Sequence, residues 1–149
     1  RPPAEVPAVP YGTWERLREG QGVAILAVGT MVVPALAAAE ELAREGVECT
    51  VVNARFLKPM DEAMLETLVQ DHGVFVTVEE GTIVNGFGAH LAVRLQTTRP
   101  DIRVVALGVP DRLIEQAPRA EQLEWFGLTA GGIARRILAL HREESLEPR

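Results

Sequence analysis

Short, nearly continuous apolar runs recur along this chain and are separated by helix-length segments. The runs cover residues 23–28, 48–53, 74–78 and 102–107. Runs of this length that are rich in Val, Ile and Leu are typical of strands buried on both faces of a sheet. Because parallel strands need long crossovers, we expect helices between them. The alternation predicts a mostly parallel, three-layer α/β/α domain with right-handed crossovers.

The segments between the runs carry helical periodicity and boundary signals. In the first of them, Leu36, Ala39 and Ala43 are expected to face the sheet. Asp61 and Thr129 are the expected N-caps of two later helices, and we expect the chain to fray from His141 onward. The predicted helices are residues 33–45, 61–72, 86–97, 118–126 and a last helix that follows residue 129.

The start of the chain differs from the rest. Residues 1–10 contain four prolines, a composition that excludes a helix or central strand and predicts an extended linker. We therefore expect the chain to be part of a longer protein, with its domain at 11–149. Residues 11–20 fit neither helical nor strand periodicity well, and we interpret them as an edge strand.

Composition narrows the class of protein. The chain has 149 residues, of which 47% are hydrophobic and 24% charged, as expected for one globular domain. A net charge of −6 argues against non-specific binding to nucleic acid. No apolar run approaches the roughly 18 residues of a membrane span, and we predict no signal peptide. Cys49 is the single cysteine, which predicts a buried, inert thiol and a cytoplasmic protein.

Two adjacent acids, Glu79 and Glu80, end the third apolar run. Adjacent carboxylates at a strand end could repel each other and prepare one of them as a general base. Alternatively, one acid caps a helix or pairs locally while the other is solvated, because alternate strand residues point in opposite directions. We favour the second interpretation, since structural networks also gather acids.

The segment that follows, with Asn85, Gly86 and Gly88, opens the next helix. Free backbone N–H groups there could bind phosphate, but the G-x-G-x-x-G fingerprint and a P-loop lysine are both missing. Close backbone packing is the favoured explanation of these glycines. Arg55 and Lys58, just past a strand end, could bind an anion or a partner's carboxylate, or form a solvated surface pair.

Four ordered motifs and the ending resemble one known family. The motifs are residues 52–61 (VNARFLKPMD), 76–80 (VTVEE), 86–88 (GFG) and 107–111 (LGVPD), and the ending is 127–133 (GLTAGGI). In this order they resemble the C-terminal domain of 1-deoxy-D-xylulose-5-phosphate synthases, thiamine-diphosphate enzymes of the transketolase superfamily. Asn85 departs from the glycine that is common in the family, although asparagine tolerates a left-handed backbone best among other residues.

The resemblance implies a transketolase C-terminal-like fold with five strands, the first antiparallel at the edge, which would be residues 11–20. It implies a parent enzyme that condenses pyruvate with glyceraldehyde 3-phosphate, releasing carbon dioxide, in isoprenoid, thiamine and pyridoxal biosynthesis. Thiamine diphosphate and magnesium would be held by the N-terminal and middle domains. For this chain the resemblance implies no catalytic, cofactor-binding or metal-binding residue, but a role in packing and in a homodimer.

Candidate contacts with other domains or with an anion are Arg55, Lys58, Glu79, Glu80, Asn85, Gly86, Gly88 and Asp111. Two alternatives remain: the C-terminal domain of a 2-oxo-acid dehydrogenase beta subunit, or a free-standing regulatory module that binds phosphate through Arg55, Lys58 and the glycine turn. His72, His90 and His141 are expected on different helices, without metal-ligand spacing. A domain of a larger enzyme is expected to expose a contiguous apolar patch where its neighbours dock.

Overall fold

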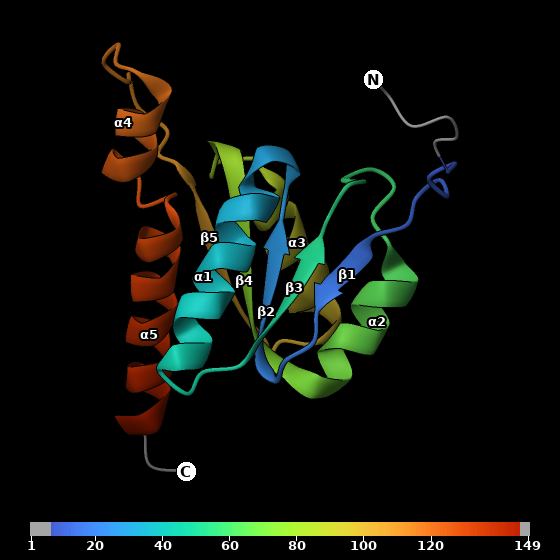
Figure 1. The fold of residues 1–149 in the computed structure, drawn as a ribbon. Coiled ribbons are helices and arrows are strands. Elements are labelled where there is room, and N and C mark those ends of the chain that lie inside the picture. The colour runs from blue at the N-terminus through green and yellow to red at the C-terminus, as the bar shows by residue number, and fades with distance from the viewer. Residues whose placement is uncertain (1–6, 147–149) are drawn as a thin grey trace.

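The computed structural model describes residues 7–146, which form one five-stranded sheet with helices on both faces (Figure 1). The strand order is β1-β3-β2-β4-β5. Only the β1–β3 pair among these is antiparallel, and the other pairs are parallel. This arrangement confirms the predicted fold class. The strands are β1 (Glu15–Arg18), β2 (Gly22–Ala27), β3 (Cys49–Asn53), β4 (His72–Thr82) and β5 (Arg103–Val109).

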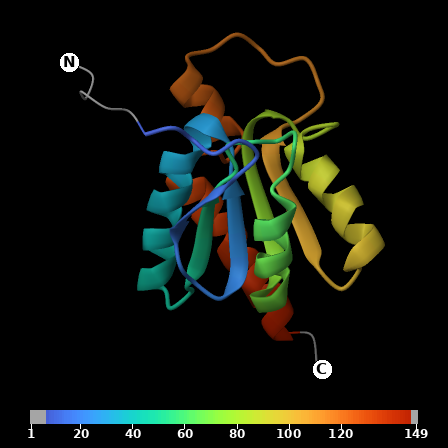
Figure 2. The ribbon, with the colours of Figure 1, turned by 90° about the vertical axis from the view of Figure 1, so that its right-hand side faces the viewer.

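The helices form two outer layers. One layer consists of α1 and α5, and the other of α2 and α3, as two views at right angles show (Figures 1 and 2). The short helix α4 lies beyond the end of the sheet (Figure 1). The bounds are η1 (Gly29–Met31), α1 (Val32–Arg44), α2 (Glu62–Asp71), α3 (Phe87–Thr98), α4 (Arg119–Trp125) and α5 (Ala130–Leu146).

Each face of the sheet carries its own hydrophobic cluster. Alternate strand residues point to opposite faces, so Ile25 of β2 joins the cluster beneath α1 and α5, and its neighbour Leu26 joins the other. Both side chains are fully buried. On β4, Val76 likewise joins the cluster beneath α1 and α5 and Phe75 joins the other cluster, and both are fully buried. Burial of each such side chain contributes about 1.5–3 kcal/mol. The runs that form β2, β3 and β4 were correctly interpreted as strands covered on both faces, whereas β5, at the edge of the sheet, is only partly buried.

The inner stripe of α1 differs from the prediction. Its fully buried residues are Ala35, Ala38, Ala39 and Leu42. Leu36 is only partly buried at the margin of the cluster, and Ala43 is also partly buried. Alanine has no side chain beyond Cβ, so a face rich in alanine lets α1 lie close to the sheet and to α5. In a helix with so many alanines, hydrophobic periodicity alone did not identify this face.

Several predicted boundaries are confirmed and others shift. Asp61 accepts a hydrogen bond from the backbone N–H of Met64 at 3.0 Å, and Thr129 Oγ1 accepts one from that of Gly132 at 3.2 Å, so both N-caps are confirmed. His72, expected within a helix, is the first residue of β4. Its ring Nδ1 lies 2.9 Å from the Leu68 carbonyl oxygen and its Nε2 lies 2.8 Å from the Thr50 hydroxyl. The ring therefore connects the end of α2 to strand β3.

The two ends of the chain test the remaining expectations in part. Residues 7–10 form neither helix nor strand, as a linker would, while residues 1–6 lie outside the described part. The domain boundary at 10/11 stays a prediction. At the other end, helix α5 continues to Leu146, so fraying from His141 is wrong over these residues. Leu140 is buried, and Arg103 pairs with Glu143 at 3.0 Å, which holds the last turns; residues 147–149 lie outside the description.

Cys49 is the basis of a first prediction. The side chain is fully buried in β3, and burial raises the pKa of the Cys49 thiol to about 12. At about pH 8, where an exposed thiol is partly ionised, the folded chain should not react with an aromatic disulfide reagent, as followed by absorbance. In guanidinium chloride the same sample should release one equivalent. Rapid, complete reaction in native buffer would show that the thiol is accessible.

Candidate functional site

Glu79 ends the buried part of β4 and caps helix α3. The backbone N–H of Phe87 donates to Oε2 and that of Gly88 to Oε1, each at 3.0 Å. The N-cap residue itself, Gly86, has no side chain that could do this. Glu79 is only 6% exposed, and its carboxylate lies where the helix dipole favours an anion. Both of its oxygens are engaged, which confirms the capping interpretation.

The turn before α3 requires the residue types found there. Asn85 has φ 59°, a left-handed conformation that asparagine tolerates better than most residues. A Cβ on Gly86 would overlap the carbonyl oxygen of Thr82 and lie 2.6 Å from Glu79 Oε1. Glycine at this position therefore lets the turn close around the buried carboxylate, as the close-packing interpretation predicted.

Gly88 brings α3 against the sheet. A Cβ here would overlap Thr77 Oγ1 on β4 and lie 2.6 Å from the Cβ of Ala106 on β5. The N–H groups of Phe87 and Gly88, which the phosphate-binding alternative required, are already bound by Glu79. That part of the alternative is wrong, because the protein supplies its own anion.

Glu80 points away from Glu79 and joins three elements. Arg119 of α4 donates from Nε to Oε1 and from Nη2 to Oε2, both at 2.6 Å. The hydroxyl of Thr30, in η1, donates to Oε2 at 2.6 Å. These hydrogen bonds, with Arg119 the larger cause, lower the pKa of Glu80. The prediction that the second acid is simply solvated is wrong, because Glu80, although exposed, is bound by partners that lie 39 and 50 residues away in the sequence.

Arg55 binds the segment at the beginning of the domain. Its Nε donates to the carbonyl of Thr13 at 2.9 Å and its Nη2 to the Thr13 hydroxyl at 3.0 Å. Its Nη1 lies 3.3 Å from Oε2 of Glu15. The guanidinium is therefore committed to the N-terminal segment rather than to an external anion. Lys58, in contrast, is exposed and forms no hydrogen bond or ion pair with the described residues.

Two contacts of this region were missed by sequence reasoning. Asp61 accepts a second hydrogen bond, from the backbone N–H of Trp14 at 2.7 Å. The indole Nε1 of Trp14 donates to the carbonyl of Phe56 at 2.7 Å. Arg119, the partner of Glu80, was also missed. No local pattern marks these partners, because each contact joins segments that are distant in the sequence.

The predicted residues do not converge on one pocket. Glu79 and Glu80 lie near the end of β4 and the glycine turn follows it, whereas Arg55 and Lys58 follow β3, and β2 lies between these strands. Asp111 is exposed just beyond β5. A hollow of about 280 Å³ lies beyond the sheet and is lined by none of these residues; its lining is Arg112, Leu113, Ile114, Glu115, Trp125 and Phe126.

Two further observations concern metal binding and membrane spanning. Among residues 7–146, no group of three or more His, Cys, Asp or Glu side chains is placed to hold a metal ion. No helix in the same range combines the length and apolar character needed to cross a bilayer.

The buried cap leads to a second prediction. Glu79→Gln keeps the size of the side chain but places an amide NH₂ against a backbone N–H, so one hydrogen bond and the favourable charge are lost. We expect the free energy of unfolding to fall by about 1–3 kcal/mol, measured by urea denaturation. Glu66→Gln, on the exposed side of α2, is the matched control. Equal stability of the two variants would contradict the structural role of Glu79.

The clamp on Glu80 predicts a pH dependence. A carboxyl whose pKa is lower in the folded state contributes stability at neutral pH, and this contribution is lost as the pH falls through the folded-state pKa. Glu80→Gln should therefore be less stable than the parent chain at about pH 7, with the difference shrinking below the ordinary value of 4.5. Arg119→Gln, which removes the main cause, should behave alike in urea titrations. A difference that stays constant with pH would refute this account.

Sequence comparison identifies relatives for most of the chain. The model of the family described as "Transketolase, C-terminal domain" matches residues 12–133. A 1-deoxy-D-xylulose-5-phosphate synthase of Geobacillus thermodenitrificans is 46% identical over 134 residues, which are 89% of this chain and 21% of the relative. The enzyme of the same name from Aquifex aeolicus is 45% identical over 87% of this chain and 20% of its own length. The chain spans about a fifth of the length of these relatives.

Solved structures of transketolases superpose on this chain. A protein described as a split gene transketolase, in an inactive beta4 tetramer, is 34% identical and superposes with a TM-score of 0.79, covering 93% of this chain and 45% of its own. The transketolase of Campylobacter jejuni, 21% identical with a TM-score of 0.59, covers 86% of this chain and 18% of its own, and shows the fold alone. With the family model and the sheet order in agreement, this chain belongs to the transketolase C-terminal domain family.

Proposed function

We propose that this chain is the C-terminal domain of a 1-deoxy-D-xylulose-5-phosphate synthase, where it packs against the preceding domains and supports a homodimer. The observation that carries the proposal is the identity of 46% and 45%, over 89% and 87% of the chain, to two enzymes of that name. Relatives with this name favour a synthase over the C-terminal domain of a 2-oxo-acid dehydrogenase beta subunit.

The contacts of the candidate residues support a structural role. A general base needs a carboxylate oxygen within reach of its substrate, but both oxygens of Glu79 bind the α3 backbone. Both oxygens of Glu80 bind Arg119, and Arg55 binds Thr13. These side chains stabilise the domain, and the proposal gives none of them a part in the chemistry.

The parent enzyme would condense pyruvate with glyceraldehyde 3-phosphate, with loss of carbon dioxide, in the cytoplasm. The described residues of this chain do not fit a diphosphate–magnesium site. The α3 N-terminus, the candidate for phosphate, is filled by Glu79, and no suitable group of metal ligands lies within residues 7–146. Thiamine diphosphate and magnesium therefore belong, in this proposal, to the N-terminal and middle domains, and no step of the reaction is assigned to this chain.

The proposal is tested with the full-length parent and with this chain alone. The parent should form 1-deoxy-D-xylulose 5-phosphate from the two substrates and should carry a Gly-Asp-Gly…Asn motif upstream. This chain alone should neither turn over pyruvate nor give heat of binding with thiamine diphosphate and magnesium in calorimetry. Binding or turnover by this chain alone would overturn the proposal. So would a Glu79→Gln parent that stays folded and dimeric but loses its turnover.

A further inference from the structure

Exposed large hydrophobic side chains gather at one edge of the sheet. We call this the carboxyl edge, because β2, β3, β4 and β5 all end there. Nine such side chains are exposed among the described residues, and of these only Leu17, within β1, and Val93, within α3, lie away from the carboxyl edge. The others belong to the segments at this edge, which are residues 7–14, the first turn of α1, 54–60, 83–86 and 110–126.

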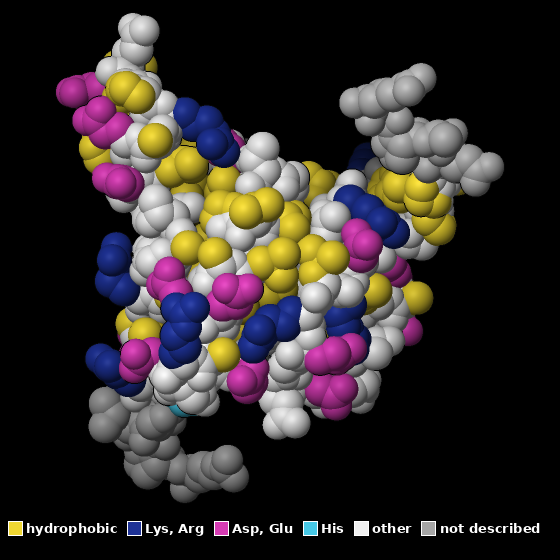
Figure 3. All heavy atoms as spheres, in the orientation of Figure 1, with side chains coloured by type: hydrophobic (Ala, Val, Ile, Leu, Met, Phe, Trp, Pro, Cys, Tyr) yellow, Lys and Arg dark blue, Asp and Glu magenta, His cyan; other side chains and the backbone are white. Residues whose placement is uncertain are grey.

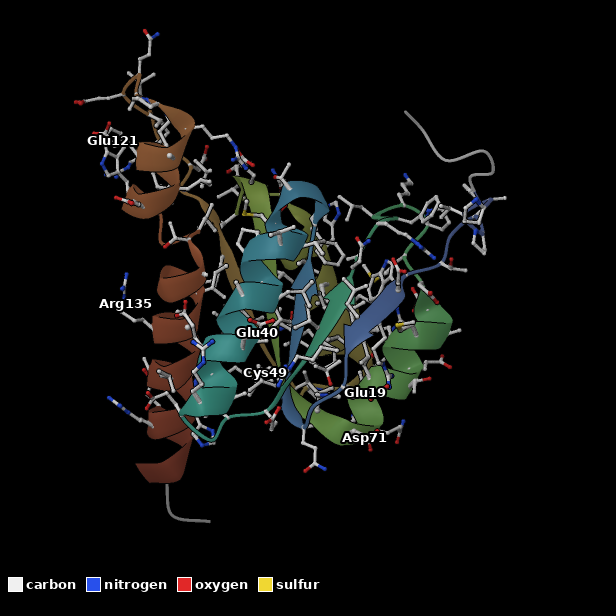
Figure 4. The ribbon with its side chains drawn as sticks, in the orientation of Figure 1. Glu19, Glu40, Cys49, Asp71, Glu121 and Arg135 are labelled. Atoms are coloured by element: carbon white, nitrogen blue, oxygen red, sulfur yellow. The ribbon has the colours of Figure 1, made fainter. Side chains whose placement is uncertain are left out.

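The opposite edge has a different chemistry. Its exposed residues include several acids, namely Glu19, Glu45, Glu48, Asp71 and Asp101. Glu19 and Asp71 lie at this lower end, facing solvent (Figure 4). In the space-filling view hydrophobic side chains gather over the upper middle of the face, while charged side chains are frequent in the lower half and also occur at the upper left, where α4 lies (Figure 3). Exposed large hydrophobic side chains are thus concentrated at the carboxyl edge, which also carries exposed charged residues such as Lys58, Asp111 and Arg112.

Residues 110–126 form an arm that rises above the carboxyl edge and returns to α5 (Figures 1 and 2). Leu113 on this arm is 98% exposed and Trp125 is 50% exposed. Both line the hollow of about 280 Å³. Arg119 ties the arm to Glu80 at the end of β4 with two hydrogen bonds of 2.6 Å. The arm is thus anchored in place while its apolar side chains face outward.

We propose that the carboxyl edge, with this arm, is the surface on which the preceding domain of the parent polypeptide docks through an apolar face of its own. The inference rests on the proposed function, since it requires a parent enzyme with preceding domains. It goes further by naming the surface, and it offers the carboxyl edge as the apolar docking site expected of a domain of a larger enzyme.

Two observations select this occupant. The curated relatives are about five times as long as the matched segment, which covers 21% and 20% of them, so most of their chain is available to cover this domain. The first described residues of the polypeptide also run along the carboxyl edge. There the indole of Trp14 donates a hydrogen bond to the Phe56 carbonyl, and Arg55 donates one to the Thr13 carbonyl. The first described residues therefore lie beside the apolar surface, and the proposal joins the preceding domain on this side.

The test measures side-chain accessibility in the full-length parent. Leu113→Cys and Val93→Cys place thiols at two sites that are exposed in this domain, one on the arm and one on α3, away from the carboxyl edge. Each variant is treated with a maleimide, and labelling is followed at the peptide level by mass spectrometry. We expect Leu113→Cys to react at least about tenfold more slowly than Val93→Cys, because a site that is open in a tenth of the molecules reacts at about a tenth of the rate.

Controls separate the possible occupants. Equal labelling of the two variants overturns the inference, as does protection that disappears on dilution to the monomer, which would identify a second copy. Protection that requires an added small ligand also overturns it. Trp125→Cys repeats the measurement if Leu113→Cys does not fold. The parent's enzymatic activity is assayed separately, so a parent that shields Leu113→Cys without forming the sugar phosphate contradicts the proposed function but not the docking surface.

Discussion

The carboxylate of Glu79 closes the N-terminus of α3, and the packing at this end of the molecule depends on it. Burying a charged group is costly unless it is hydrogen-bonded, and here two backbone N–H groups at 3.0 Å compensate for the burial. The same contact places Gly88 against Ala106 of β5. One buried anion thus ties α3 to β4, and it leaves no room for a side chain at position 86.

This arrangement explains how a stretch that resembles a ligand site is occupied by contacts within the domain. In open α/β sheets, ligands usually bind outside the carboxyl ends of the strands, where helix N-termini can receive an anion. In this domain Glu79 occupies the N-terminus of α3, and Glu80 fastens the arm through Arg119. Other α/β proteins bind ligands at this edge of the sheet. Here the helix N-terminus is filled by an internal carboxylate, and the surrounding segments expose apolar side chains, which suits the edge to contact another protein domain.

Sequence reasoning worked where the signal is local. Apolar runs of strand length identified the four parallel strands, and Asp61 and Thr129 were recognised as N-caps because their partners lie three residues further on. It was less accurate for α1, since its many alanines give nearly equal hydrophobicity to several faces and Leu36 was assigned to the inner stripe. His72 was misplaced because its partner Thr50 lies on another strand.

The sequence by itself determined the α/β architecture, the family and the positions of the acids and glycines, because hydrophobic periodicity and turn chemistry act between neighbouring residues. Only the tertiary structure decided what those residues do. Whether Glu79 and Glu80 are free or bound depends on α3 and Arg119, and whether Arg55 can bind an anion depends on Thr13. The position of the apolar surface was also decided there, because a shared sheet edge gathers side chains from segments that are far apart along the chain.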